Sequence, residues 1–325
     1  MIRMAHGSGG KETEELVKSV FLKHFHSDAL GRLEDAAVLE LTGTAAFTTD
    51  SFVVTPLFFK GGDIGRLAVC GTVNDLLMMG AQPRYLSAGF IIEEGLPLGA
   101  LDTVAASMAR TAEEAGVSIV AGDTKVIEGH GGLYINTSGI GIIPNGRDIS
   151  AARCAPGDAI LVSGHLGDHH ACILSARMKI ENGIASDAAP LGAPVKALLE
   201  SGAAVKAMRD VTRGGLATII NELCAASGIG AILEEATLPV AAQTAAFCEI
   251  LGLDPLYMGN EGKFAAVVKA SDVSQALDAL RSTPEGRHAA VIGRVTEGKG
   301  VTLETKLGGR RRLGVLAGEG LPRIC

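Results

Sequence analysis

Strand-like and helix-like segments alternate along this sequence, and that alternation restricts the fold more than any other feature. Short apolar runs with strand character, each reaching an acidic residue, cover residues 33–38, 47–51 and 118–125. Apolar residues at helical spacing indicate a buried helix at 64–79 and an amphipathic helix at 97–116, the latter ending at a glycine cap. We therefore predict an α/β (α+β) fold in which each apolar face is buried against another layer.

The length of the chain predicts two domains. Its 325 residues are more than one domain usually holds, and 47% of them are hydrophobic, which is enough for ordinary cores. After a strand-like run at 133–143 the sequence takes on turn and linker composition, so we place the boundary near Ala155. The expected units are an N-terminal domain at 1–154, a C-terminal α/β domain at 155–312 and a flexible tail at 313–325.

Charge and hydropathy exclude two broad classes of protein. The formal net charge is -7, whereas a general nucleic-acid binder normally carries a basic face. The mean hydropathy is positive, but no window contains the roughly 18 unbroken apolar residues that a membrane-spanning helix requires. Residues 1–12 also lack the apolar core of a secretory signal. We expect a soluble, cytoplasmic protein with no membrane or nucleic-acid partner.

Cysteine usage singles out the end of the sequence. Six cysteines are present without a CxxC pair, which fits neither a disulfide framework nor a structural zinc site. Cys70, Cys224 and Cys248 lie in apolar helical contexts and are expected to be small buried hydrophobic residues. Cys325 follows small, polar and proline residues, and a fully extended tail from Leu313 would reach roughly 40 Å. Cys325 is either a tethered reactive thiol or an accidental surface cysteine.

Aspartates in the first half suggest a metal site. Asp75 is flanked by apolar residues, so its carboxylate must face water or be compensated by a cation. A single aspartate at an element edge is usually a turn or helix cap. Four acids fall at expected edges within one segment, and a shared site is then the stronger hypothesis for Asp35, Asp50, Asp75 and Asp123. Such oxygen ligands suit Mg²⁺, which commonly bridges carboxylates and nucleotide phosphates.

Two motifs that look like known binding sites depart from the required pattern. Residues 6–11 resemble a phosphate loop, but Ala5 and Glu12 break the Walker pattern. This stretch is either a mobile lid carrying one cation or a frayed terminus. His165 and His169 have the spacing of a metal-binding pair, but the glutamate of HExxH is missing, so a capping turn is the preferred interpretation.

Two stretches in the second half are stronger candidates, at 209–216 and 259–264. In the first, an acid and a threonine precede a Gly-Gly helix start, whose free N–H groups form a natural anion site. The alternative is that its two arginines are simple surface charge.

Eight motifs together resemble one protein family. They are HGSGGK, TTDSFVV, GGDIG, NDLLMMGA, AGDTKV, MRDVTRGGLA, NEGKF and the terminal PRIC. Over essentially its whole length the chain resembles the HypE family, which are maturation factors for NiFe hydrogenases. Most of these motifs are shared with a superfamily of ATP-using enzymes that includes aminoimidazole ribonucleotide synthetase, selenophosphate synthetase and thiamine monophosphate kinase. The PRIC tail is specific to the HypE family.

The resemblance implies a PurM-like architecture, in which strands of the N-terminal domain pair across a homodimer and Mg-ATP binds between the domains. By motif, Mg²⁺ and the phosphates would be held by Asp35, Asp50, Asp75 and Asp210. The rest of the nucleotide site would be formed by Asn74, Asp123, Thr212 and Lys11, the last on a loop that closes over it. The chain departs from the expected motifs at Glu34, where sister enzymes often have aspartate, and at Lys60, where proline is expected.

The resemblance also implies a reaction. HypE proteins receive a carbamoyl group on the terminal cysteine, here Cys325, from the carbamoyltransferase HypF, and dehydrate it to a thiocyanate with ATP. The cyanide then passes to iron on the HypC–HypD complex. Proton removal needs a base, and we expect Glu261 or Lys125 to act as one, because both lie in strand-end motifs expected to face the nucleotide. An ion pair or a cap is the alternative role for each.

Two rival functions stay open at the level of sequence. A sister ATP-dependent synthetase or kinase acting on a small molecule would not need the tail. A non-catalytic carrier or scaffold would use the tail only for docking and would bind no nucleotide.

Overall fold

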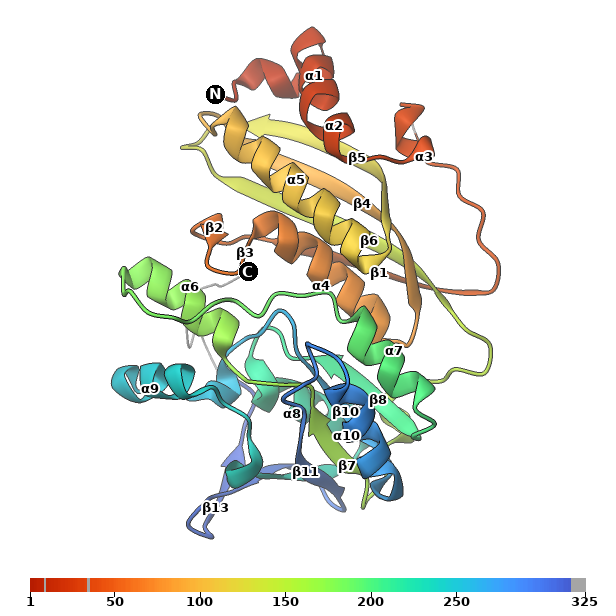
Figure 1. Ribbon diagram of the computed structural model, residues 1–325, viewed down its shortest axis with the longest axis vertical. Helices are drawn as coiled ribbons and strands as arrows, with labels where there is room; N and C mark the ends of the chain where they lie inside the picture. Colours follow the sequence, from red (N-terminus) through yellow and green to blue (C-terminus); the bar gives the residue numbers. More distant parts are fainter. Residues whose placement is uncertain (9, 34–35, 317–325) are drawn as a thin grey trace.

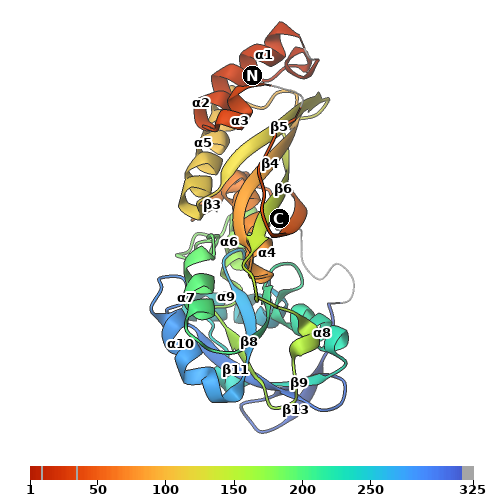
Figure 2. The same ribbon diagram turned by 90° about the vertical axis from the view of Figure 1, so that its right-hand side faces the viewer.

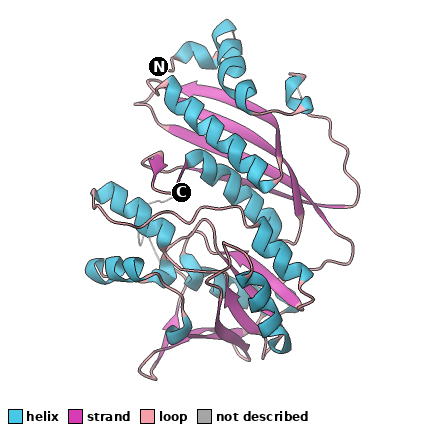
Figure 3. Ribbon diagram, viewed as in Figure 1, coloured by secondary structure: helices cyan, strands magenta, loops and turns pink. Residues whose placement is uncertain are grey.

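The structure is a computed structural model that describes residues 1–8, 10–33 and 36–316. It has two large sheets with their helices, one above the other (Figure 1), and a small two-stranded sheet of β2 and β3. The strands are β1 (Thr44–Phe52), β2 (Phe58–Phe59), β3 (Gly62–Asp63), β4 (Gln82–Glu93), β5 (Ser118–Ile127), β6 (Leu133–Ile143), β7 (Ala159–Val162), β8 (Val205–Asp210), β9 (Gly230–Glu234), β10 (Phe264–Val268), β11 (Ala290–Thr296), β12 (Gly300–Glu304) and β13 (Arg310–Leu313). The helices are α1 (Lys11–Leu16), α2 (Leu22–His24), α3 (Asp28–Gly31), α4 (Ile64–Met78), α5 (Leu98–Ala115), α6 (Asp168–Met178), α7 (Gly192–Glu200), α8 (Gly215–Ser227), α9 (Ala242–Leu251) and α10 (Val273–Arg281). Figure 3 shows how they alternate with strands.

The N-terminal sheet has the strand order β1-β6-β4-β5, in which only the β4–β5 pair is parallel. One face of this sheet is covered by α4, since the Thr137 hydroxyl on β6 donates to the backbone carbonyl of Ala68 at 2.9 Å. The helix α5 and the N-terminal helices lie on one side of the sheet (Figure 2). On the opposite face, every second residue of β1 is exposed; Phe47, for example, is 68% exposed. We call these the inner and the outer face.

The C-terminal sheet has the order β13-β12-β9-β11-β7-β10-β8. Its central strands β7 and β10 are buried throughout, as is typical of strands covered on both faces. Alternate residues of β10 belong to two separate clusters: Phe264 packs in the core that includes α7 and α10, whereas Ala265 packs in the core that includes α8. The first of these cores continues into the N-terminal domain through Ala188 and Leu191.

Several expectations from the sequence are confirmed. The helix expected at 64–79 is α4, and the one expected at 97–116 is α5, which ends at Gly116 in the left-handed conformation. A glycine adopts that conformation without strain, which explains the end of the helix there. The strand expected at 133–143 is β6. The domain boundary near Ala155 stays a prediction, and Ala155 lies between β6 and β7. No helix in the described residues is long and apolar enough to cross a membrane.

Two expectations about the first half were wrong. Residues 36–38 of the run expected as a strand are irregular, and Val38 is 78% exposed, because no neighbouring strand pairs with this segment. The aspartates do not all lie at element edges: Asp75 is inside α4, and Asp123 is in the middle of β5. The spacing of apolar residues indicates which segments are extended. It does not show where a strand continues beyond an acidic residue because it pairs with a neighbouring strand.

Candidate functional site

Three aspartates from three different elements gather where the two domains meet. Asp50 is on β1 opposite Thr137, on the inner face that α4 covers. Asp75 is on α4 and accepts a hydrogen bond of 2.8 Å from the hydroxyl of Thr48. Asp210 is the last residue of β8, a strand against which α4 packs. The fold therefore brings together acids that are up to 160 positions apart in the sequence.

These three carboxylates disfavour one another's charge. Burial raises the pKa of Asp210 to about 7, and the carboxylates of Asp75 and Asp50 add to that effect. Burial likewise raises the pKa of Asp75, with a further contribution from Asp50. For Asp50, burial again raises the pKa, while a hydrogen bond from the Ser51 backbone N–H and the charge of Arg213 oppose the change. The group is thus a concentrated, incompletely neutralised negative charge.

The Gly-Gly motif turns the chain at this group and presents its arginines there. Gly214 and Gly215 have φ angles of 83° and 67°, which only glycine adopts without strain. A Cβ on Gly215 would also lie 2.5 Å from the carbonyl oxygen of Leu256. Arg213 favours the charged form of Asp50, and Arg209 favours the charged forms of Asp75 and Asp210. Both arginines are exposed, and their charges oppose the repulsion among the aspartates.

Asp123 and Lys125 lie on the other side of the sheet. In the register of the sheet, Asp123 is opposite Gly89, Gly89 is opposite Asn136, and Asn136 is opposite Ser51. Since paired residues share a face and neighbours along a strand alternate, these residues are on the outer face and Asp50 is on the inner face. Asp123 forms an exposed ion pair of 2.9 Å with Lys125. Within one chain, the structure does not bring this pair to the three aspartates.

The other predicted nucleotide-site residues have mixed positions. Lys11 at the start of α1 is exposed and forms an ion pair of 3.7 Å with Glu15. Thr212 is half-buried, and its carbonyl accepts from the Gly215 N–H in the turn before α8. Asn74 is buried, and its side chain is used in backbone hydrogen bonds to the C-terminal domain, described below. Asp35 and Cys325 lie outside the described residues.

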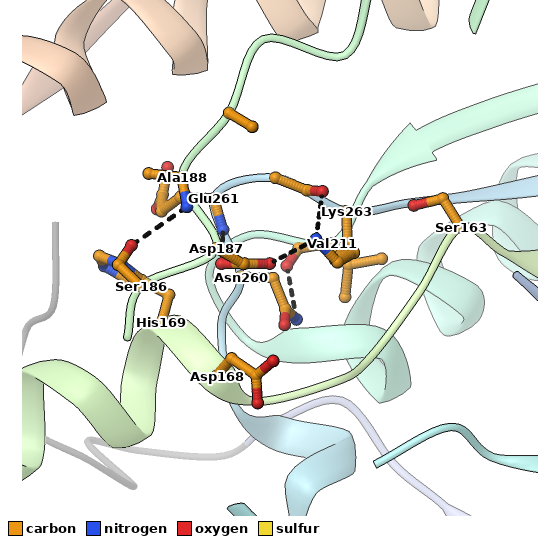
Figure 4. A network of polar contacts seen from close by, with 12 residues as sticks. Ser163, Asp168, His169, Ser186, Asp187, Ala188, Val211, Asn260, Glu261 and Lys263 are labelled. Atoms are coloured by element: carbon orange, nitrogen blue, oxygen red, sulfur yellow. Dashed lines mark hydrogen bonds and ion pairs between the residues drawn. The ribbon is translucent and has the colours of Figure 1, made fainter. Parts of the chain in front are cut away.

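Glu261 is buried, with 4% of its surface exposed, just before β10. Its backbone N–H donates to a carboxylate oxygen of Asp187 at 3.0 Å, and Asp187 in turn lies 3.4 Å from the ammonium group of Lys263 (Figure 4). The sequence analysis did not include Asp187. It lies in a segment of alanine and proline without periodicity, and the only signal in the sequence was an acid within an otherwise apolar stretch.

An apolar pocket of about 270 Å³ lies between the N-terminal helices and the sheet. Phe21 forms one wall and packs on Phe90 of β4 with ring centroids 4.5 Å apart. The polar groups at its border come from Thr13, Asp123 and Thr124. Its size and lining suit a flat, largely apolar ring with one polar edge.

Histidines and cysteines elsewhere are structural. His165 stacks on His288 at 4.1 Å, and His169 shares a hydrogen bond of 2.8 Å with Ser186. Within the described ranges, no three His, Cys, Asp or Glu side chains lie close enough to form a ready metal site. Cys70, Cys224 and Cys248 are buried as predicted.

The first residues of the expected tail rest on α8. Asn221 donates to the carbonyl oxygen of Leu313, and the backbone N–H of Leu316 donates to the hydroxyl of Thr218 at 3.3 Å. The Tyr257 hydroxyl donates to the carbonyl of Gly314 at 3.2 Å. The tail therefore starts beside α8, with Leu316 about one turn from the beginning of that helix, and residues 211–214 connect the helix to Asp210.

Comparison with known proteins gives consistent matches over the whole chain. Residues 33–143 match the N-terminal domain of AIR synthase related proteins, and residues 155–306 match the C-terminal domain. A protein from Rhodobacter capsulatus named carbamoyl dehydratase HypE is 48% identical, with 100% of this chain and 98% of that protein covered. A crystal structure of a hydrogenase maturation protein HypE in complex with ATP has a TM-score of 0.96 at 47% identity, with both chains covered completely. A HypE chain in a HypE–HypF complex has a TM-score of 0.82 at 44% identity, covering 93% of this chain and 99% of that one.

Proposed function

The chain belongs to the HypE family of carbamoyl dehydratases, within the AIR synthase related proteins, and on this premise we propose that it dehydrates a carbamoyl group on its own Cys325. ATP drives the reaction, and the product is a thiocyanate that supplies the cyanide ligand of the iron in a NiFe hydrogenase. The structural observation that supports this function is the group of Asp50, Asp75 and Asp210 facing two arginines at the domain boundary. Carboxylates and guanidinium groups together suit a metal-bound triphosphate.

The reaction moves one oxygen atom from carbon to phosphorus. The carbonyl oxygen of the S-carbamoyl group attacks the γ-phosphorus of ATP, and the bond from that phosphorus to the bridging oxygen breaks to release ADP. Loss of one N–H proton leaves an S-imidate phosphate. When the second N–H proton is removed, the C–O bond breaks, phosphate leaves and the S–C≡N group remains. Catalysis consists of positioning, charge neutralisation and removal of two protons.

The donor atoms at the aspartate group fit Mg²⁺. Asp50, Asp75 and Asp210 would hold the ion, with Asp35 as the further candidate from the sequence. Bound with the nucleotide, Mg²⁺ would neutralise charge on the transferred phosphoryl group. Mg²⁺ usually takes one or two carboxylates and fills its other positions with phosphate oxygens and water. A group of acids that is not already a closed ligand set is consistent with that mode of binding.

The apolar pocket beside Phe21 supports a place for the base of the nucleotide. Its volume of about 270 Å³ and its aromatic wall fit a purine ring, and Thr13 and Thr124 provide polar groups at the border. Lys11, at the start of α1, would then come near the phosphates when the preceding loop closes. Asn74 contacts the C-terminal domain in the structure, so its proposed part in the site is to hold the domains together and not to bind the nucleotide.

Glu261 is the better candidate for the base that removes the N–H protons. It is buried and close to the domain boundary, since the Asn74 amide on α4 lies 3.4 Å from its backbone carbonyl. A carboxylate in such a site has few competing interactions with water. Lys125 is on the outer face of the sheet and would take part from a second chain.

The outer face supports a homodimer. It carries the exposed apolar side chains Phe47 on β1, Ile91 on β4 and Ile127 on β5, with exposures of 68%, 46% and 41%. A sheet with apolar groups on an uncovered face is a common subunit interface. In such a dimer Lys125 and Asp123 of one chain would approach the site of the other.

The proposed partners follow the reaction. A HypF carbamoyltransferase would load Cys325, and a HypC–HypD complex would accept the cyanide. A HypE protein of the same family has been crystallised with HypF, which supports the first partner. A cytoplasmic location, where ATP is available, fits this chemistry.

The test separates dehydration from loading by attaching the carbamoyl group chemically. Cyanate carbamoylates thiolates, and burial raises the pKa of Cys70, Cys154, Cys172, Cys224 and Cys248. These five therefore react slowly. After mild cyanate treatment and addition of Mg-ATP, intact mass spectrometry should show the loss of one water from the adduct, and Cys325→Ala should show none. An adduct that keeps its mass in the presence of Mg-ATP would contradict the proposal.

Three further variants separate the rival functions. A sister enzyme acting on a small molecule would keep its ATPase activity, and its substrate turnover, after deletion of residues 321–325. A carrier or scaffold would not bind Mg-ATP and would be unaffected by Asp50→Ala or Asp75→Ala. We expect calorimetry to detect binding of Mg-ATP by the intact chain and a large loss of affinity in both aspartate variants.

A further inference from the structure

An extended segment of the C-terminal domain, residues 186–191, passes between the N-terminal domain and the turn that carries Glu261. We call it the strap. It has no regular secondary structure and connects α6 to α7. On one side the Ser186 N–H donates to the carbonyl of Lys60 at 2.8 Å. On the other side the Ala189 N–H donates to the carbonyl of Glu261 at 3.4 Å. The strap is therefore hydrogen-bonded to both.

Asp187 is the charged residue of the strap, and its side chain is 6% exposed. One carboxylate oxygen accepts the Glu261 backbone N–H at 3.0 Å, and the other lies 3.4 Å from the Lys263 ammonium (Figure 4). Lys263 also donates to the carbonyl of Gly262 at 2.8 Å. The carboxylate thus contacts the residues before and after Gly262. Burying a carboxylate costs free energy unless its charge is compensated, so it is an unusual group for holding a backbone in place.

Gly262 shows how closely the strap approaches this turn. A Cβ at position 262 would lie 1.9 Å from the carbonyl oxygen of Asp187 and 3.1 Å from the backbone nitrogen of Ala189. The first distance is far inside van der Waals contact, so the position requires glycine. The backbone of the strap and the backbone of residues 261–262 are in direct contact, and any movement of one displaces the other.

The N-terminal domain fixes the strap from above through two side chains of α4. The Asn74 amide donates to the carbonyl of Ala189 at 3.1 Å and accepts from the Leu191 N–H at 2.9 Å. Arg66 donates to the carbonyl of Ala188 at 2.7 Å, and its guanidinium also binds Glu114. The strap is consequently held from both domains at the level of Glu261.

We propose that Asp187 is a positioning residue for the proton-transfer step: by accepting the backbone N–H of Glu261 while paired with Lys263, it fixes the Glu261 carboxylate where it meets the carbamoyl nitrogen. This inference rests on the proposed role of Glu261 as the base. Asp187 itself contacts none of Asp50, Asp75 and Asp210, so we expect its loss to act on the base more than on the nucleotide site. A misplacement of about 1 Å in a catalytic group can lower a rate by roughly a hundredfold.

The test compares two nearly isosteric replacements, Asp187→Asn and Asp187→Leu. Both leave Lys263 without its partner, but only the asparagine keeps an oxygen that can accept the Glu261 N–H. The difference between the two therefore reports that hydrogen bond alone. We measure the single-turnover loss of water from the cyanate-loaded chain at saturating Mg-ATP, and the affinity for Mg-ATP by calorimetry. Asp254→Asn, which breaks an exposed ion pair with Arg311, is the matched control.

We expect Asp187→Leu to dehydrate its tail roughly ten- to a hundredfold more slowly than the unmodified chain, and Asp187→Asn to recover most of that rate. The affinity for Mg-ATP should change less than about twofold, which a general loss of structure would not permit. The pH profile provides a second readout, and it also applies if Asp187→Leu does not fold. Asp168, Lys263 and the Arg66 guanidinium also lie near residue 187 and are unchanged in this variant. Removing the negative charge of Asp187 favours an ionised carboxylate nearby, so the acidic limb of the Asp187→Asn profile should move to lower pH.

The outcomes distinguish this inference from the function on which it rests. Equal rates for Asp187→Leu and Asp187→Asn, together with an unmoved pH profile, would overturn the positioning role. If Glu261→Gln dehydrates its tail at the normal rate, then the proposed base is wrong, whatever the Asp187 variants do. A loss of Mg-ATP affinity equal to the loss of rate would assign Asp187 to the nucleotide site and would also overturn the inference.

Discussion

Replacing Asp210 by asparagine should stabilise the nucleotide-free protein at high pH. Asp210 lies at the end of β8 close to two other carboxylates, and among the described residues its charged form is compensated by a backbone hydrogen bond and the charge of Arg209. Asparagine has nearly the same shape as a protonated aspartate and never ionises. The substitution therefore removes the repulsion without creating a cavity.

The pKa of Asp210 sets the size of this effect. Burial and the Asp75 carboxylate raise it to about 7, compared with 3.8 for an ordinary aspartate. At about 1.4 kcal/mol per pKa unit, this gap corresponds to about 4 kcal/mol at most. Because the side chain keeps partial exposure and its neighbours adjust, we expect about 2 kcal/mol. Since folding raises the pKa, the stability linked to this proton is fully present below about pH 4 and is lost as the pH rises through 7.

Thermal unfolding without nucleotide or divalent cation, at about pH 5 and about pH 8.5, tests this prediction. The quantity compared is the Tm of Asp210→Asn minus the Tm of the unmodified chain. This difference should be larger at pH 8.5 than at pH 5 by roughly 4 to 8 °C. Other groups, such as His170 with a pKa lowered to about 4 by burial, change both proteins equally and cancel in the comparison. Asp148→Asn, at an exposed carboxylate, is the control. A Tm difference that is the same at both pH values would refute the reasoning.

Three other predictions concern the same region. Near pH 7, binding of Mg-ATP should release part of a proton from Asp210. Calorimetry in two buffers with different heats of ionisation should then give different binding enthalpies, and Asp210→Asn should remove most of that difference. Asn74→Leu should lower the free energy of unfolding, measured by chemical denaturation, by about 2 to 3 kcal/mol, because buried backbone groups lose their hydrogen-bond partners. A large loss of Mg-ATP affinity in this variant would instead make Asn74 a nucleotide ligand. A mixture of Lys125→Ala and Glu261→Gln chains should recover dehydration that neither shows alone, and no recovery would mean that Lys125 does not act from a second chain.

The sequence was sufficient to predict those helices whose apolar pattern follows directly from burial. The apolar repeat of α4 and the glycine after α5 gave the helices almost to the residue, because helical spacing and capping are local properties. The run at 33–38 had the composition of a strand, but its residues 36–38 pair with no neighbouring strand, and pairing is a property of the whole sheet. The aspartates were recognised as a set, but their arrangement depends on the register of β1, β6, β4 and β5, which no local pattern contains.

The structure was needed to show on which face of the sheet each site residue lies and which residues it contacts. Asp123 and Asp50 looked equivalent in the sequence, yet the register puts them on opposite faces of one sheet. The role of Asp187 had no periodic signal in the sequence, since a hydrogen bond donated to a carboxylate by a backbone N–H 74 residues away leaves no periodicity in either segment. Motifs show which chemistry a chain can carry. They do not show which residues hold the catalytic groups in place.

Adjacent residues of α4 connect the two halves of the proposed chemistry. Asp75 belongs to the aspartate group that would bind the metal-nucleotide complex, and Asn74 holds the strap against Glu261. Successive side chains on a helix point about 100° apart, so one rigid turn contacts both sites. Mg²⁺ held at Asp75 would reduce the repulsion among the aspartates, and any resulting shift of α4 would reach the strap through Asn74. On the proposed assignments, the helix that would help to bind the metal-nucleotide complex also contacts the segment beside the proposed base, Glu261, so we expect α4 to couple proton removal to nucleotide binding.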